Sequence, residues 1–177
     1  LAVPVAIMRL SDNKLISGIT GAYIYIMRGT PLMLQLMFVY FGLPSVPVIG
    51  VTLSRESAIA LAFILNYAAY LAEILRGGIL SIPPGQWEAG KVLGLSRSYT
   101  FMRIILPQAI RNVLPSISNE VITLVKDTSL VYVLGVTDVM KVAKATSNTT
   151  ASFAPYLYAG IVYLLMIAIL TQILTRI

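Results

Sequence analysis

One short stretch, PPGQWEAGKVLG at positions 83 to 94, has a residue spacing that could bind phosphate. The G-x-x-x-x-G-K order of a nucleotide-binding loop is supplied by Gly85, Gly90 and Lys91. In such a loop the next residue is Ser or Thr, whose hydroxyl binds magnesium, whereas here it is Val92. Glu88 would also place negative charge where backbone N–H groups must hold the phosphates. The stretch is therefore not expected to bind a nucleotide.

The other residues suited to chemistry are carboxylates, because the chain contains no cysteine and no histidine. That composition excludes the usual zinc ligands and His-assisted nucleophilic catalysis. Glu120 and Asp127 are seven positions apart, so on a helix they share one face about 10.5 Å apart along the axis. An intramembrane protease needs an acid and a base held close together, and this spacing does not favour that alternative.

The composition indicates what must position these residues. Hydrophobic residues make up 58% of the 177 positions and charged residues 11%, with a mean hydropathy of +0.85. A soluble domain is about 25% charged, so this chain has too few charges for a water-facing surface. We therefore expect a membrane protein whose whole length, 1–177, is a single transmembrane domain.

Apolar stretches of about 20 residues, the length that crosses about 30 Å of hydrocarbon, predict an all-α protein with about five transmembrane helices. The first is expected to be truncated at the N-terminus. The predicted ranges are 1–10 and roughly 19–43, 56–75, 107–126 and 154–176. The sequence RGTP should interrupt the second range, because Gly29 and Pro31 weaken a helix and Pro31 disfavours helical geometry at Thr30.

Basic residues set the predicted orientation in the membrane. Residues 76–111 hold several cations against one acid, Glu88, and should be cytoplasmic. Those cations are Arg76, Lys91, Arg97, Arg103 and Arg111. The net charge of +6 follows largely from this topology, and it requires no nucleic-acid partner.

The cytoplasmic loop contains a longer spaced pattern, EAGKVLGLSRSYTFMRIILP, which begins at Glu88. It resembles the EAA loop of the membrane subunits of ABC importers: E-A-A, three residues, G, nine residues, I, one residue, L-P. Every spacing matches in this loop, at about 76–107, and the one departure is Gly90 in place of the second alanine. The match extends further, since three other stretches are similar to permeases of the polar amino acid family: 28–44, 66–79 and 119–136.

The resemblance implies a cytoplasmic coupling helix that docks on a separate ATP-binding cassette ATPase. Small residues would allow close approach of the partner, apolar ones would contact it, and Glu88 would cap the start of the helix. The predicted docking residues are Glu88, Ala89, Gly90, Leu93, Gly94 and Leu95. ATP and magnesium would be bound by the ATPase, so this chain is expected to hold no cofactor or metal and to catalyse no reaction itself.

Ionisable residues at membrane depth cost about 2.5–3.5 kcal/mol each, so they suggest a pathway for the substrate. Glu120 and Asp127 would hold the cationic groups of an amino acid, and Arg28 beside the RGTP break would hold its carboxylate. Packing and ion pairing are the alternatives, and Glu73 is explained adequately by an ion pair with Arg76. The predicted substrate-binding set is Arg28, Thr30, Asn66, Glu73, Glu120 and Asp127.

Relatives that import basic amino acids typically carry an acid at the position of Glu120, so the resemblance favours arginine, lysine or histidine as substrate. It also implies a second permease copy or a similar partner chain, an extracytoplasmic binding protein, and a multi-pass location in the bacterial cytoplasmic membrane. An ion-driven secondary carrier is the alternative function. That carrier could use Glu120 for protons, but it gives no reason for the EAA spacing.

Overall fold

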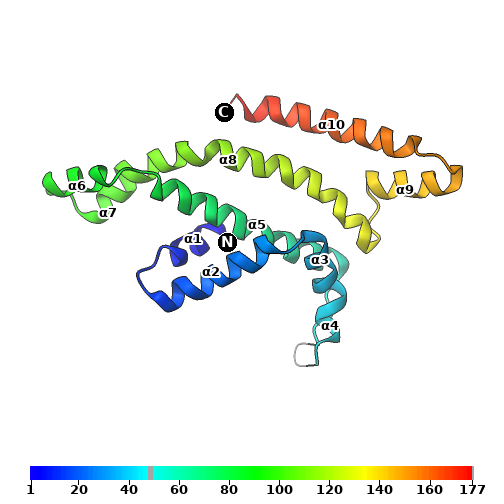
Figure 1. Cartoon of the computed structure of the whole chain (residues 1–177), viewed down its shortest axis with the longest axis horizontal. Coiled ribbons are helices and arrows are strands. Elements are labelled where there is room, and N and C mark those ends of the chain that lie inside the picture. Colours follow the sequence, from blue (N-terminus) through cyan, green and yellow to red (C-terminus); the bar gives the residue numbers. More distant parts are fainter. Residues whose placement is uncertain (48–49, 177) are drawn as a thin grey trace. The chain divides into compact units, whose positions relative to one another are not determined.

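The computed structural model describes residues 1–47 and 50–176, and all regular elements in these ranges are helical (Figure 1). This confirms the predicted all-α class. The α-helices are α1 (Ala2–Arg9), α2 (Lys14–Gly29), α3 (Leu32–Met37), α4 (Leu43–Ser45), α5 (Arg55–Leu80), α6 (Pro84–Val92), α7 (Arg97–Thr100), α8 (Leu106–Asp127), α9 (Val139–Thr150) and α10 (Ala154–Leu174). Two π-helical segments, η1 (Phe38–Gly42) and η2 (Phe101–Ile105), and one 3-10 segment, η3 (Thr128–Leu134), connect them.

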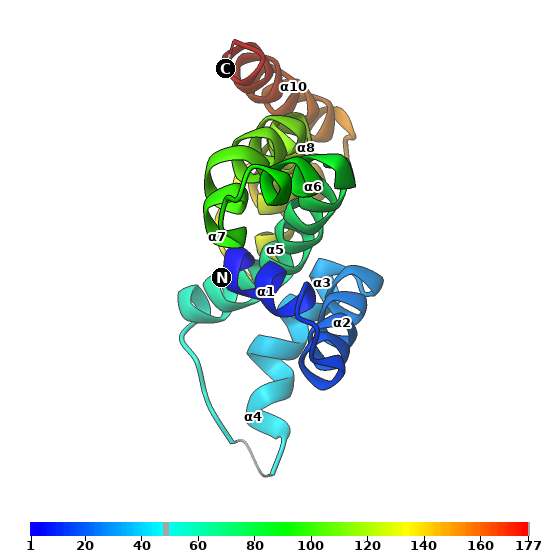
Figure 2. The ribbon, with the colours of Figure 1, turned by 90° about the vertical axis from the view of Figure 1, so that its left-hand side faces the viewer.

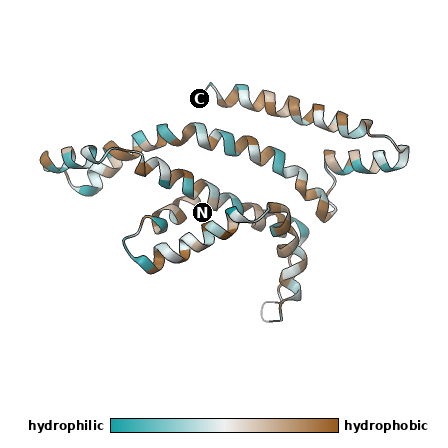
Figure 3. Ribbon diagram, in the orientation of Figure 1, coloured by the Kyte–Doolittle hydropathy of each residue, from teal (hydrophilic) through white to brown (hydrophobic). Residues whose placement is uncertain are grey.

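The length and apolarity of the helices decide which of them can cross a membrane. Within the described residues, α5 and α10 qualify alone, and α2 together with Leu32–Ser45 qualifies as one broken span. These agree with the predicted ranges 56–75, 154–176 and 19–43. The range 107–126 forms α8, which has the expected length but alternates polar and apolar residues (Figure 3). α8 is not apolar enough to qualify as a membrane span, and α1, with eight residues, is too short to qualify.

The chain forms two compact units. Unit 1 comprises Leu1–Gly29 and Leu65–Ile117, and unit 2 comprises Thr30–Ile64 and Ser118–Ile177. The predicted interruption at RGTP marks one boundary, since α2 ends at Gly29 and α3 begins at Leu32. Pro31, with φ of −63° and ψ of 134°, is extended at the start of α3. A proline suits this position because its missing N–H is not needed there.

In unit 1, α1 lies against α2 (Figure 2). The Arg9 guanidinium donates to the Ser17 hydroxyl over 2.6 Å, and that hydroxyl donates to the Arg9 carbonyl over 3.0 Å. Small residues of α5 complete the apolar core, whose buried members are Val5, Ala6, Ile24, Ala69 and Ala72. The polar link and the small side chains together fix the short helix α1 on its neighbours.

In unit 2, η3 packs against α3 and α9 packs against α10. The turn between η3 and α9 is held by polar contacts. Gly135 ends η3 in the left-handed conformation with φ of 79°, and its carbonyl accepts from Lys141 Nζ over 2.5 Å. Asp138 caps α9, because one carboxylate oxygen accepts from the Lys141 N–H over 2.8 Å. The segment that follows α8 is therefore tied closely to α9.

Candidate functional site

The EAA-like loop forms two short helices, α6 and α7, separated by a tight turn. α6 begins at Pro84, directly after Pro83, so Glu88 lies in the middle of the helix. The expectation that Glu88 caps the helix start is therefore wrong. Proline is preorganised for the first position of a helix, and the two prolines start α6 one turn earlier than the acid would.

Gly94 ends α6 through its backbone conformation. Its φ is +70°, a left-handed geometry that L side chains rarely adopt. The Gly94 N–H donates to the Lys91 carbonyl over 3.1 Å, and the Leu95 N–H donates to the Gly90 carbonyl over 2.9 Å. This pair of bonds is a Schellman motif, which satisfies carbonyls that the helix end leaves open. The glycine of the spaced pattern is thus required by the turn itself.

Gly90 is buried against the next helix. A Cβ at this position would lie 2.5 Å from Thr100 Oγ1 and 2.7 Å from Thr100 Cγ2. Thr100 is 2% exposed, and its hydroxyl donates to the Ser96 carbonyl over 3.1 Å. Gly90 therefore allows α6 and α7 to pack closely within this chain. Its predicted contact with an ATPase stays a prediction, and sequence analysis did not identify Thr100 as its neighbour.

The remaining predicted docking residues are mostly exposed in this chain. Glu88 and Ala89 are exposed, and Leu95 is partly buried. Leu93 at the end of α6 is 73% exposed, next to Val92 at 86%. Exposing apolar side chains to water is unfavourable, so two adjacent ones at a helix end mark a surface suited to contact with another molecule.

The predicted substrate residues of unit 1 lie on α2 and α5. Asn66 is 4% exposed, and its amide donates to the Met27 carbonyl over 3.1 Å. The Arg28 guanidinium lies over the Tyr70 ring at 5.2 Å. Met27 and Arg28 belong to the last turn of α2, where carbonyls lack partners within the helix. Asn66 thus supplies a hydrogen bond to a helix end that the RGTP break creates.

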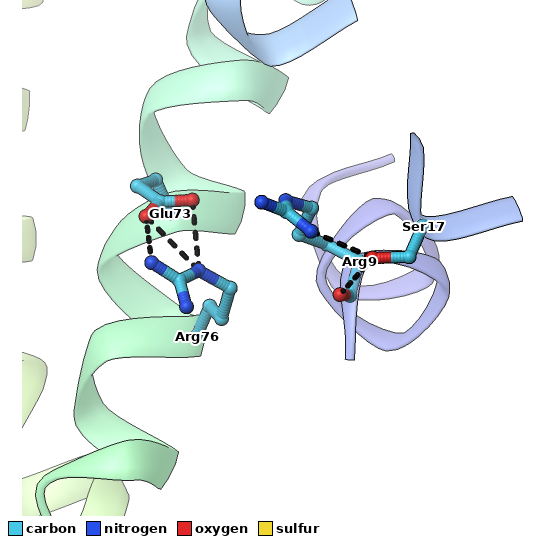
Figure 4. Close-up of polar contacts among 4 residues, drawn as sticks. All are labelled: Arg9, Ser17, Glu73 and Arg76. Carbon is cyan, nitrogen blue, oxygen red and sulfur yellow. Dashed lines mark hydrogen bonds and ion pairs between the residues drawn. The ribbon is translucent and has the colours of Figure 1, made fainter. Parts of the chain in front are cut away.

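Glu73 forms an ion pair with Arg76, as the three-residue spacing predicts (Figure 4). Arg76 Nε donates to both carboxylate oxygens of Glu73 over 3.0 Å, and Arg76 Nη2 makes a further contact with Oε1. The Arg9 guanidinium points toward this pair from α1 (Figure 4). The carboxylate is therefore already engaged by an arginine of its own helix.

The predicted substrate residues of unit 2 are Thr30, Glu120 and Asp127. Thr30 is exposed, and the Gln35 amide donates to its hydroxyl over 2.7 Å and to its carbonyl over 3.1 Å. Glu120 and Asp127 are both partly buried on α8, in the last two turns of the helix. Their position on one helix agrees with the spacing argument, and their contact with a substrate stays a prediction.

Comparison with known proteins places the chain among transport components. Residues 1–177 match the family model described as binding-protein-dependent transport system inner membrane component. The arginine transport system permease protein ArtQ of Bacillus subtilis is 39% identical over 98% of this chain and 78% of that protein. The nopaline transport system permease protein NocM of Agrobacterium fabrum is 38% identical over 98% of this chain and 75% of that protein. A Rickettsia conorii protein named as a glutamine transport system permease, GlnP, is 36% identical over 95% of this chain and 77% of that protein.

Solved structures give the same result. A crystal structure of an amino acid ABC transporter with histidines is 34% identical, with a TM-score of 0.89 over 99% of this chain and 81% of that one. The inward-facing MetNI methionine ABC transporter shares the fold, with a TM-score of 0.77 and 16% identity. The match covers 99% of this chain and 83% of that one. These matches confirm the resemblance indicated by the EAA-like loop: the chain belongs to the family of binding-protein-dependent transport system inner membrane components.

Proposed function

We propose that this chain is the membrane-spanning subunit of an ATP-driven importer of basic amino acids in the bacterial cytoplasmic membrane. Two permease chains would form the pathway, an extracytoplasmic binding protein would deliver the substrate, and a separate ATPase would supply the energy. The observation that carries this proposal is the loop α6–α7. It keeps the full spacing of an EAA motif and ends α6 in two exposed apolar residues, Val92 and Leu93.

The conformation of the loop supports a docking role. Pro84 starts α6, the Schellman turn at Gly94 ends it, and Gly90 packs against Thr100. A helix fixed at both ends loses little conformational entropy on binding, so it can transmit a displacement of its partner. Alternating access would follow when two docked ATPases close and the attached helices rock around a site in the membrane.

The docking role is tested by Leu93→Glu, with Leu15→Glu as the matched control. The two leucines are 73% and 71% exposed, and Leu15 lies in the first turn of α2, where a carboxylate is tolerated. Leu93→Glu should abolish co-purification of the neighbouring ATPase and stimulation of its activity by substrate in lipid vesicles. Leu15→Glu should preserve both. Equal retention of the ATPase by both variants would refute docking at this loop.

The substrate class rests on charge. Glu120 and Asp127 place two carboxylates on α8, a helix that the sequence analysis predicts to cross the membrane, and their charge would suit a cationic side chain. Relatives named for arginine transport and for glutamine transport match this chain at similar identity, so overall sequence similarity does not distinguish these two substrates. The acid at position 120 is what favours a basic amino acid.

Replacing Glu120 with Gln tests this choice. The amide keeps the size and shape of the side chain, but it removes the charge and replaces one acceptor oxygen with a donor NH2 group. Transport of arginine or lysine should fall at least about tenfold, the factor for about 1.4 kcal/mol of lost charge pairing, while basal ATP hydrolysis stays close to wild type. Equal losses in transport and in hydrolysis would indicate a structural role instead. If no ATPase associates with the wild-type chain, the ion-driven carrier becomes the better explanation.

A further inference from the structure

A pocket of about 500 Å³ lies within unit 2, where the first half of α10 passes the end of α8 and the start of η3. Its polar lining includes Lys126, Ser129, Tyr156 and Tyr163. Gly160 also lines it, and an added Cβ there would have nothing packed against it within 4 Å. The pocket therefore has room beside α10 for a chain of atoms. None of its residues belongs to the docking loop or to the predicted substrate set.

The membrane level of the pocket follows from α10. This helix is long and apolar enough to cross a membrane, and 6% of the residues in its most apolar window are buried inside the chain. Tyr156 lies in the first turn of α10, and tyrosine is enriched where hydrocarbon meets lipid head groups. Tyr163 is seven residues further, about 10.5 Å deeper along the helix axis. The pocket therefore extends from the membrane boundary into the hydrocarbon.

The charge of the pocket favours an anion. Lys126 is exposed in the last turn of α8, and it is the one charged side chain among the described residues that line the pocket. Its ammonium makes no ion pair with a carboxylate in the described part of the chain. Ser129 and Tyr156 add hydroxyl donors at the same end of the pocket, and both are partly buried. The pocket is suited to a ligand with an anionic head and an apolar tail.

The transported amino acid does not match this pocket. Lys126 and Asp127 are adjacent on α8, so their side chains point about 100° apart around the helix axis. The proposed substrate carries a cationic side chain, which a pocket with a single lysine would repel. The pocket therefore lies beside the predicted pathway and not in it.

A second copy of the chain is a poor source of the anion. The segment 139–177, which contains all of α9 and α10, has no Asp and no Glu. In a two-fold dimer, a copy that covers this face with its own α10 brings the same segment and no carboxylate. Lipid phosphates, in contrast, lie at the level where α10 enters the membrane. The anion that matches Lys126 is available from the membrane itself.

We propose that this pocket binds one anionic phospholipid. The Lys126 ammonium and the Tyr156 hydroxyl donate hydrogen bonds to the phosphate oxygens, and an acyl chain lies in the open space beside Gly160. A zwitterionic lipid brings its own cation, for which the described lining offers no carboxylate, so the anionic lipid is preferred. The bound lipid links the end of α8 to α10.

The first test compares two lysines that lose the same charge. Lys126→Gln removes the pocket cation, and Lys144→Gln removes an exposed lysine of α9 that lies over the Tyr132 ring, outside the pocket. The full chain, with its partner subunits, is extracted from vesicles of phosphatidylcholine and phosphatidylglycerol, and the retained lipids are measured by mass spectrometry. Lys126→Gln should lower the preference for phosphatidylglycerol about fivefold, and Lys144→Gln should keep it. Equal losses would mean general attraction to the surface and would overturn the proposal.

The second test fills the space for the acyl chain. Gly160→Leu places a side chain in the pocket, whereas Ala168→Leu adds one at an exposed position of the same helix. Gly160→Leu should lower the retained phosphatidylglycerol at least as much as Lys126→Gln, and Ala168→Leu should leave it unchanged. Full retention by Gly160→Leu would show that no acyl chain lies there. Loss of the second permease copy from this variant in pure phosphatidylcholine would show that a protein occupies the face, and it too would overturn the proposal.

A third measurement uses the wild-type chain, so it does not depend on how the variants fold. Phosphatidylglycerol and phosphatidylcholine, each with a photoreactive diazirine near the start of one acyl chain, are incorporated into vesicles at the same fraction. After irradiation, adducts of phosphatidylglycerol should be concentrated between Tyr156 and Tyr163. Equal labelling of this segment by the two lipids would contradict an anionic site. Displacement of the adducts by glycerol phosphate would identify a soluble phosphate as the ligand instead.

Discussion

Helices α5 and α10 are both long and apolar enough to cross a membrane, yet their surroundings differ. In the most apolar window of α5, 33% of the residues are buried within the chain, against 6% in α10. α5 buries mainly alanines, namely Ala58, Ala62, Ala68, Ala69 and Ala72. α10 has large exposed apolar side chains along its length and one buried residue, Ala159.

The difference shows that apolarity alone does not assign a helix to the protein interior. In a membrane, lipid tails solvate leucine as well as a protein does, so helices associate where small side chains let their backbones approach. α5 supplies such a surface and α10 does not. A helix that is apolar on all sides is suited to contact with lipid or with another subunit.

The largest effect is expected from an Ala→Leu exchange made once in each helix. Ala69 is fully buried among Val5, Ala6, Ile24 and Ala72, so Ala69→Leu should cost about 1–3 kcal/mol through overpacking. Ala168 is exposed on α10, and Ala168→Leu should stay within about 0.5 kcal/mol of wild type. Thermal melting of the purified protein, followed by loss of its monodisperse peak, compares the two. Similar melting shifts would remove the distinction between the helices.

A smaller effect is expected from Gly→Ala exchanges. A Cβ at Gly78 of α5 would lie 2.1 Å from Val113 Cγ1 and 3.2 Å from the Ala109 carbonyl oxygen. Val113 is branched and buried, so α8 must move, and Gly78→Ala should destabilise despite a gain of about 1 kcal/mol in helix propensity. Gly160 of α10 has open space, and Gly160→Ala should raise the melting temperature slightly. A rise in both variants would show that the packing at Gly78 is loose.

The smallest effect is expected from removal of one polar contact. Asn66→Ala takes a hydrogen bond from the Met27 carbonyl, and such bonds between helices in a membrane contribute about 0.6 kcal/mol on average. Gln172→Ala on α10 is the control, because that side chain is exposed. Hydrogen exchange of the last turn of α2 should accelerate in Asn66→Ala alone. Unchanged exchange there would show that Asn66 does not stabilise the helix end.

Local features of the site were accessible from the sequence. The RGTP break and the pairing of Glu73 with Arg76 were both predicted, because each depends on residues within one turn of the chain. The start of α6 was placed wrongly because the charge of Glu88 was given more weight than the fixed φ of Pro84. The role of Gly94 in the turn was missed, although a glycine six positions after the acid is consistent with a helix end.

The sequence by itself determined that the chain is helical and apolar, where one helix breaks, and that a loop with the EAA spacing lies between α5 and α8. These properties follow from short-range sterics and hydrogen bonds. Only the tertiary structure decided that Gly90 faces Thr100, that Asn66 bonds to Met27, and that α5 buries a larger share of its residues than α10 does. The first two contacts join residues 10 and 39 positions apart, and which surfaces meet depends on the path of the whole chain.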